Sequence, residues 1–97
     1  MLNQVIICGR LVDIEENTDT SLKLTIAVPR PYKNVDGIYE NDNVACIVMN
    51  GTKEKMNSYI KKGDIMGIRG RVQVNDGQMI IIAEKVTFLS SHKKEEE

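Results

Sequence analysis

The residues best suited to chemistry are basic side chains that alternate with two tyrosine rings. The densest group is Arg30-Pro31-Tyr32-Lys33, and Tyr39 follows a few residues later. Cationic side chains attract phosphates, and tyrosine rings stack against unpaired bases. The pattern favours contact with a phosphate chain and exposed bases, and the candidate cations are Arg10, Arg30, Lys33, Lys53, Lys62, Arg69 and Arg71.

Two of these cations have a second interpretation that the sequence leaves open. Arg69 and Arg71 are two residues apart in a predicted strand, so their side chains point to the same side. They suit a track for phosphates. They also suit a surface ion pair with Asp64 or Glu84.

Other site chemistries lack their residues in this sequence. The only histidine, His92, lies in a polar tail, and Cys8 and Cys46 form no CxxC pair. No Ser-His-Asp, Cys-His or paired-carboxylate set is recognisable, and no phosphate-binding glycine loop is present. We therefore expect no enzymatic activity, no metal site and no cofactor. Both cysteines lie in apolar runs, which predicts that they are buried.

The net charge of −1 hides an uneven distribution of charges. Seven of the fourteen acidic residues lie in two clusters, at residues 13–19 and 95–97. Residues 20–94 carry twelve basic and seven acidic side chains, a net charge of +5. Electrostatic attraction is screened over about 10 Å at ordinary salt, so a groove on this part of the chain can be positive.

Length and composition indicate one globular domain. The chain has 97 residues, of which 41% are hydrophobic and 28% are charged, as in ordinary globular proteins. No apolar run approaches the roughly 18 residues of a membrane span, and the first residues lack a secretion signal. We predict one domain over residues 1–90, a short disordered tail over residues 91–97, a cytoplasmic location and no membrane partner.

Five segments have the composition or the alternation of β-strands, at residues 2–12, 21–28, 43–50, 64–73 and 79–89. Polar residues 13–20 predict the first connection, and Pro29 and Pro31 end the second strand. A hairpin tip is predicted at residues 34–37, and Asn75-Asp76-Gly77 predicts a tight turn.

A short helix is predicted between the third and fourth strands. Residues 52–60 begin with a capping threonine and place three apolar side chains on one helical face. Gly63 suits the end of this helix, and Lys53 and Lys62 then also fit its exposed surface. Five strands with a helix between the third and fourth predict an all-β fold, the five-stranded Greek-key barrel called the OB fold.

Four blocks of the sequence resemble bacterial single-stranded DNA-binding proteins. Residues 1–11, M-L-N-Q-V-I-I-C-G-R-L, are similar to the family's first strand, M-L-N-x-V-x-L-x-G-R-L. Residues 59–72 resemble the end of its helix and its fourth strand, with Y-I-K-K-G-D followed by G-I-R-G-R-V. Residues 27–30 and 86–89 resemble two further blocks. The resemblance spans about residues 1 to 89.

The resemblance implies a barrel that coats single-stranded DNA during replication, recombination or repair, through phosphate contacts and base stacking. It places Tyr32 on the hairpin that carries a stacking ring in the family, with Tyr39 on the return arm as a second candidate. It places Met49 and Asn43 at or near further stacking positions. The chain has no tryptophan and one phenylalanine, Phe88, so we predict weaker contact per nucleotide and a steeper salt dependence.

The resemblance also bears on protein partners. Family members of this size pair through the first strand and commonly reach four subunits, so we predict a homotetramer, with a dimer as the second choice. The family's acidic tip ends in a proline and a phenylalanine and recruits replication and repair proteins. Residues 92–97 are acidic but lack that hydrophobic anchor, so we do not expect such recruitment.

Two other functions without catalysis stay open at this point. A primosome-type or other protein-docking OB-fold module shares the fold and binds nucleic acid weakly, and the scarcity of aromatic residues favours it. A purely structural oligomerisation module is the other. The fold alone does not decide between them.

Overall fold

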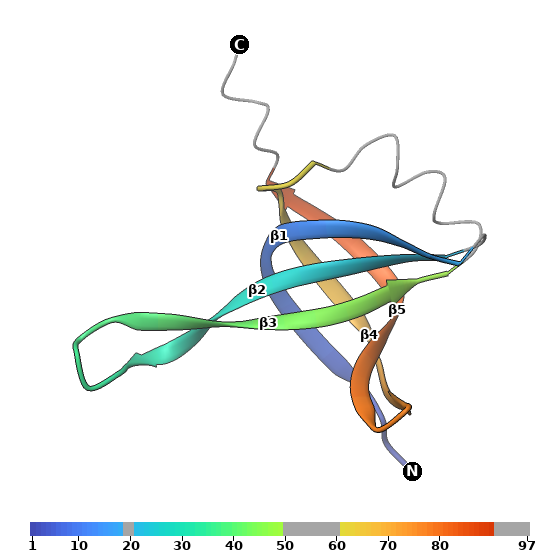
Figure 1. Ribbon diagram of the computed structural model, residues 1–97, viewed down its shortest axis with the longest axis horizontal. Helices are drawn as coiled ribbons and strands as arrows, with labels where there is room; N and C mark the ends of the chain where they lie inside the picture. Colours follow the sequence, from blue (N-terminus) through green and yellow to red (C-terminus); the bar gives the residue numbers. More distant parts are fainter. Residues whose placement is uncertain (19–20, 50–60, 91–97) are drawn as a thin grey trace.

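The computed structural model describes residues 1–18, 21–49 and 61–90, which form a barrel of five strands (Figure 1). The strands are β1 (Val5–Thr18), β2 (Ser21–Lys33), β3 (Tyr39–Val48), β4 (Ile65–Asn75) and β5 (Gln78–Ser90). The barrel closes in the order β1-β2-β3-β5-β4. All neighbours are antiparallel except β3 and β5, which are parallel. The predicted OB-fold barrel is confirmed.

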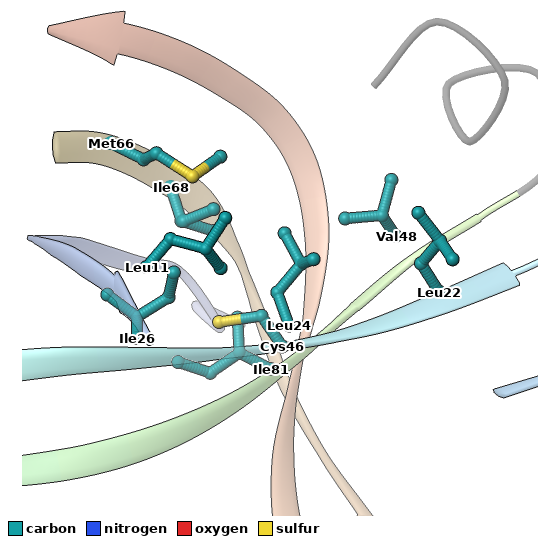
Figure 2. Close-up of a cluster of buried hydrophobic side chains, with 9 residues drawn as sticks. All are labelled: Leu11, Leu22, Leu24, Ile26, Cys46, Val48, Met66, Ile68 and Ile81. Atoms are coloured by element: carbon teal, nitrogen blue, oxygen red, sulfur yellow. The ribbon is translucent and has the colours of Figure 1, made fainter. Parts of the chain in front are cut away.

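The core fills the barrel with one face of each strand (Figure 2). Successive side chains of a strand point to opposite faces, so the alternating apolar residues of β2 all point inward. The buried cluster comprises Leu11, Leu22, Leu24, Ile26, Cys46, Val48, Met66, Ile68 and Ile81. The outer faces of the strands are thereby left for other contacts.

The structure extends β1 beyond its predicted end. Residues 13–18, predicted as a connection, continue the strand and pair with β2, with Ile14 opposite Leu24 and Glu16 opposite Leu22. Register irregularities after Leu11 and after Glu16 accommodate this polar stretch. The prediction was wrong because charged side chains are tolerated in a strand whose backbone pairs with a neighbour and whose side chains reach solvent.

The structure also extends β2 past the two prolines that were predicted to end it. Pro29 lies opposite Asn41 of β3, and the register becomes irregular between Pro29 and Lys33. These residues lie in an arm, the β2–β3 hairpin, that projects well beyond the barrel (Figure 1). A missing N–H donor is tolerated in such a two-stranded, irregular ribbon.

Both predicted turns are confirmed by their backbone angles. At the tip of the arm, the Asn34 side-chain oxygen accepts hydrogen bonds from the N–H groups of Asp36 and Ile38, and Gly37 has φ +79°. Between β4 and β5, Asp76 and Gly77 have φ values of +52° and +79°. Two consecutive positive φ values define the tight turn that suits twisted antiparallel strands.

Cys8 lies on the outer face of β1, although it was predicted to be buried. Val5 and Ile7 pack against the core, so the alternation of the strand turns Ile6 and Cys8 outward. Cys46 is buried as predicted, and this burial raises the pKa of its thiol to about 12. An apolar run therefore identified the strand but not the direction of each side chain.

Residues 61–64 anchor the chain ahead of β4. The Leu11 carbonyl accepts a hydrogen bond from Gly63 N–H, and the Leu11 N–H donates to the Asp64 carbonyl. The Asp64 side chain is buried and accepts a hydrogen bond from Lys61 N–H. The predicted helix at residues 52–60 and the predicted tail at residues 91–97 lie outside the described residues. Within the described ranges, no helix is long and apolar enough to cross a membrane.

Candidate nucleic-acid interface

A groove of about 690 Å³ lies on the outer surface of the barrel, where β2, β3 and β5 meet. The ends of β1 and β2 form one wall, and the β4–β5 hairpin forms the other. The floor is aliphatic and consists of Ala45, Ile47, Ile80 and Ile82, with Met49 at the end of β3. Ile47 is nearly buried, while Met49 is about half exposed.

One row of outward side chains crosses this floor and carries a cation at each end. Ile47 of β3 lies opposite Lys23 of β2 on one side and Ile82 of β5 on the other. Arg71 of β4 lies opposite Ile82. Cross-strand partners share a face of the sheet, so the row runs Lys23, Ile47, Ile82 and Arg71.

Polar side chains follow the outer face of β4 along the edge of the groove. Arg71 Nη2 donates to the Gln73 side-chain oxygen at 3.3 Å, and Gln73 Nε2 donates to the Asn75 side-chain oxygen at 3.0 Å. Gln78, opposite Asn75, also lines the groove. An apolar floor is thus bordered by carboxamides, which both donate and accept hydrogen bonds.

The arm carries the predicted tyrosines and Lys33. Tyr32 and Tyr39 are more than half exposed, and the Lys33 Nζ atom lies 5.8 Å from the centre of the Tyr39 ring. A cation at that distance from a ring is attracted to its face. The arm therefore presents two accessible rings and a cation beyond the barrel.

Arg30, also predicted as a phosphate contact, is bound by two carboxylates of the arm. Its Nη2 lies 2.8 Å from Asp42 and its Nη1 lies 2.9 Å from Glu40, while its Nε donates to both Asp42 oxygens at 3.1 Å. These interactions raise the pKa of Arg30 and hold the pKa of Asp42 below its ordinary value. The arrangement neutralises Arg30 within the arm.

The remaining predicted cations do not all gather at the groove. Arg10 Nη1 donates to the Gly63 carbonyl at 2.9 Å, and Lys62 lies 3.6 Å from Asp13. Arg69 faces outward opposite Lys85. Met49 lines the groove, and Arg71 lies beside its lining, opposite Ile82. Lys53 lies outside the described residues.

The alternative ion pairs of the two β4 arginines are not formed in the described part of the chain. Neither Arg69 nor Arg71 has a carboxylate partner there. Asp64 is buried and accepts a hydrogen bond from the backbone of Lys61. Among the described residues, no carboxylate therefore competes with a phosphate for either guanidinium group.

Lys23 and most residues of the groove floor were not among the candidates predicted from the sequence. Lys23 and Ile47 alternate with core residues, so a period of two gives their outward direction. The pairing of β3 with β5 is parallel and joins distant segments, and no local pattern predicts it. Among residues 1–18, 21–49 and 61–90, no group of three or more His, Cys, Asp or Glu side chains is placed to hold a metal ion.

Several known proteins are similar to this chain in sequence. A sequence model described as the Single-strand binding protein family matches residues 2–88. Single-stranded DNA-binding protein 3 of Listeria innocua is 37% identical over 105 residues, which cover 94% of this chain and 66% of that protein. Single-stranded DNA-binding protein 1 of Streptococcus pyogenes is 33% identical over 96 residues, covering 89% of this chain and 74% of that protein. A Halalkalibacterium halodurans relative is covered over only 61% of its length, so the chain spans less than two thirds of some relatives.

Solved structures with the same fold include proteins of S. cerevisiae and Plasmodium falciparum. A mitochondrial single-stranded DNA binding protein from S. cerevisiae superposes with a TM-score of 0.75 at 18% identity, covering 96% of this chain and 99% of that one. A Plasmodium falciparum SSB complex with ssDNA gives a TM-score of 0.71 at 18% identity, covering 93% and 96%. At such identities the likeness establishes the barrel fold.

Proposed function

The chain belongs to the single-strand binding protein family, and from that premise we propose that it binds single-stranded DNA along the groove, without requiring a defined sequence. The observation that carries the proposal is the row of Lys23, Ile47, Ile82 and Arg71, which places cations on both sides of an apolar floor. OB folds bind oligonucleotides over the face of strands 2 and 3, between the first and last hairpin loops. The groove occupies that position.

The row suggests how a strand lies in the groove. Phosphates lie near Lys23 and Arg71 at the edges, and the bases lie against the aliphatic floor between them. Tyr32 and Tyr39 of the arm supply further surfaces on which bases stack, with Lys33 beside them. Because the described residues of the floor include no aromatic ring, each base is held less tightly on them than on an indole, and the phosphate contacts account for more of the affinity.

This mode of binding requires no catalysis and no cofactor. Coating of exposed single strands in the cytoplasm, during replication, recombination or repair, is the role that we propose. The DNA backbone would contact Arg71 and Lys23 first, with Arg69 and Lys85 extending the positive surface along β4 and β5. Binding is then expected to weaken steeply as salt is added.

The experiment is a titration of fluorescein-labelled dT35 and of a duplex of equal length, read by anisotropy at low and at moderate salt. We expect far tighter binding of dT35 than of the duplex. Absence of binding to dT35 even in dilute buffer would overturn the proposal and would favour the protein-docking alternative. Intrinsic tyrosine fluorescence provides a second readout, because the chain has no tryptophan.

A self-association site also follows from the pairing of β1. Within the described residues, Val5–Cys8 are paired with β4 on one edge and have no partner on the β2 side, because pairing with β2 starts at Arg10. An unpaired strand edge is a template for another chain. We propose that two copies join through this edge and that two such pairs form the homotetramer, with the dimer as the smaller alternative. Sedimentation velocity with and without dT35 measures which assembly forms.

A further inference from the structure

We propose that the groove distinguishes among bases and favours thymine, by seating its C5-methyl group against the isoleucines of the floor. This inference rests on the proposed function and concerns the same groove. It predicts a preference that arises from apolar contact rather than from stacking on a ring. Thymine is the only common DNA base that presents a methyl group.

The composition of the floor supports the inference. Among the described residues that line the groove, none is aromatic, and the apolar ones are an alanine, two methionines and three isoleucines. Ile47 is 7% exposed and forms the bottom, while Ile80 and Ile82 are half-buried and border it along β5. Branched aliphatic side chains contact a methyl group well, but they offer a base no large flat face.

The borders of the groove fit the rest of a pyrimidine. Gln73 lies directly opposite Ile80, and Asn75 lies directly opposite Gln78, so carboxamides flank the isoleucines on the β4 side. Thymine carries both carbonyl acceptors and an N–H donor on its ring, and carboxamides match both kinds of group. A base with its C5 edge on Ile80 and Ile82 therefore has polar partners within the same groove.

The expected size of the preference follows from the removal of one methyl group from water. Burial of such a group favours binding by about fourfold for each seated thymine. Uracil differs from thymine in this methyl alone, and the phosphates are unchanged. Comparison of dT with deoxyuridine oligomers therefore isolates the contact from the phosphate contribution.

The experiment compares the affinities for labelled dT and dU oligomers of equal length and equal sugar, at one salt concentration. We expect at least about threefold tighter binding of the dT strand. Ile80→Ala is expected to bring the ratio close to one, mainly by weakening the binding of dT. Val35→Ala, at the exposed tip of the arm, is the matched control and should leave the ratio unchanged.

The outcomes separate this inference from the proposed function. Equal affinities for dT and dU, both of them tight, would overturn the thymine preference and leave single-strand binding intact. Failure to bind either strand would overturn both. A ratio that survives Ile80→Ala in a folded variant would also overturn the inference. Should that variant fail to fold, Ile82→Val removes a single methyl group and must lower the ratio.

Discussion

Arg30 and Asp42 form a bidentate ion pair across the two strands of the arm, with Nε and Nη2 of the guanidinium both bonded to the carboxylate. The pair lies beside Pro29, which has no N–H to donate to the ladder. Glu40 adds a second carboxylate at 2.9 Å from Nη1. The side chains of the arm thus bridge its strands where the backbone ladder is irregular.

The first prediction concerns the pH at which the arm loosens. The Asp42 pKa is held below its ordinary 3.8 mainly by the hydrogen bond from Arg30, so the pair stabilises the folded arm above that pH. The stabilisation is lost as the pH falls below 3.8 and through the lowered pKa, while Arg30 stays charged. Amide NMR signals of the arm should shift in that window. In Asp42→Asn they should already be altered at neutral pH, and a wild-type arm unaffected by acid would contradict the prediction.

The second prediction concerns two glycines of β4. A Cβ on Gly70 would overlap the carbonyl oxygen of Ile82, whereas a Cβ on Gly67 would meet Leu89 Cδ1 at an ordinary 3.7 Å. Gly70→Ala must therefore displace backbone and should lower the free energy of unfolding by about 1–3 kcal/mol. Gly67→Ala, the control in the same strand, should change it little. Urea unfolding measures both, and equal losses would show that the close approach is not the cause.

How far the sequence predicts this molecule depends on whether a feature is local. The inward row of β2 and the turn at Asp76 follow from alternation and turn chemistry, and both are found. The strand at residues 13–18 was missed because its side chains are mostly polar, whereas its extended backbone is held by the ladder with β2. Arg30 was predicted to be available to phosphates, but its charge is matched by carboxylates ten and twelve residues later, across the arm. The groove floor depends on the parallel β3–β5 pairing, which only the closed barrel determines.

The third prediction concerns the two thiols. The thiolate is the reactive form, and burial raises the pKa of Cys46 to about 12, whereas Cys8 is exposed. In Cys8→Ser, a thiol reagent at about pH 8 should label Cys46 only as fast as the barrel opens. The reciprocal variant Cys46→Ser should be labelled much faster. Rapid labelling of Cys46 in the folded protein would contradict the burial seen here.

The fourth prediction tests the cation at the β2 edge of the groove. Lys23→Gln should weaken binding of dT35 about tenfold at low salt, because one charge-assisted phosphate contact is lost. The slope of log affinity against log salt should become shallower by about 0.7. Lys62→Gln is the matched control, since Lys62 lies beside Asp13 and outside the groove lining. Equal effects of the two variants would show that the groove is not the binding surface.

The fifth prediction concerns an acidic residue, Glu15, whose neutralisation should strengthen DNA binding rather than weaken it. Glu15 of β1 lies directly opposite Lys23, so its carboxylate shares the outer face with the groove cation and repels phosphates there. Glu15→Gln should therefore tighten binding of dT35 about two- to fourfold at low salt, with the gain shrinking as salt screens the charge. Glu16→Gln removes the same charge from the next residue, whose partner is the inward Leu22. A strand bound across the row of Lys23 and Ile47 responds to the first variant more than to the second, whereas attraction by net charge alone would make the two variants equal.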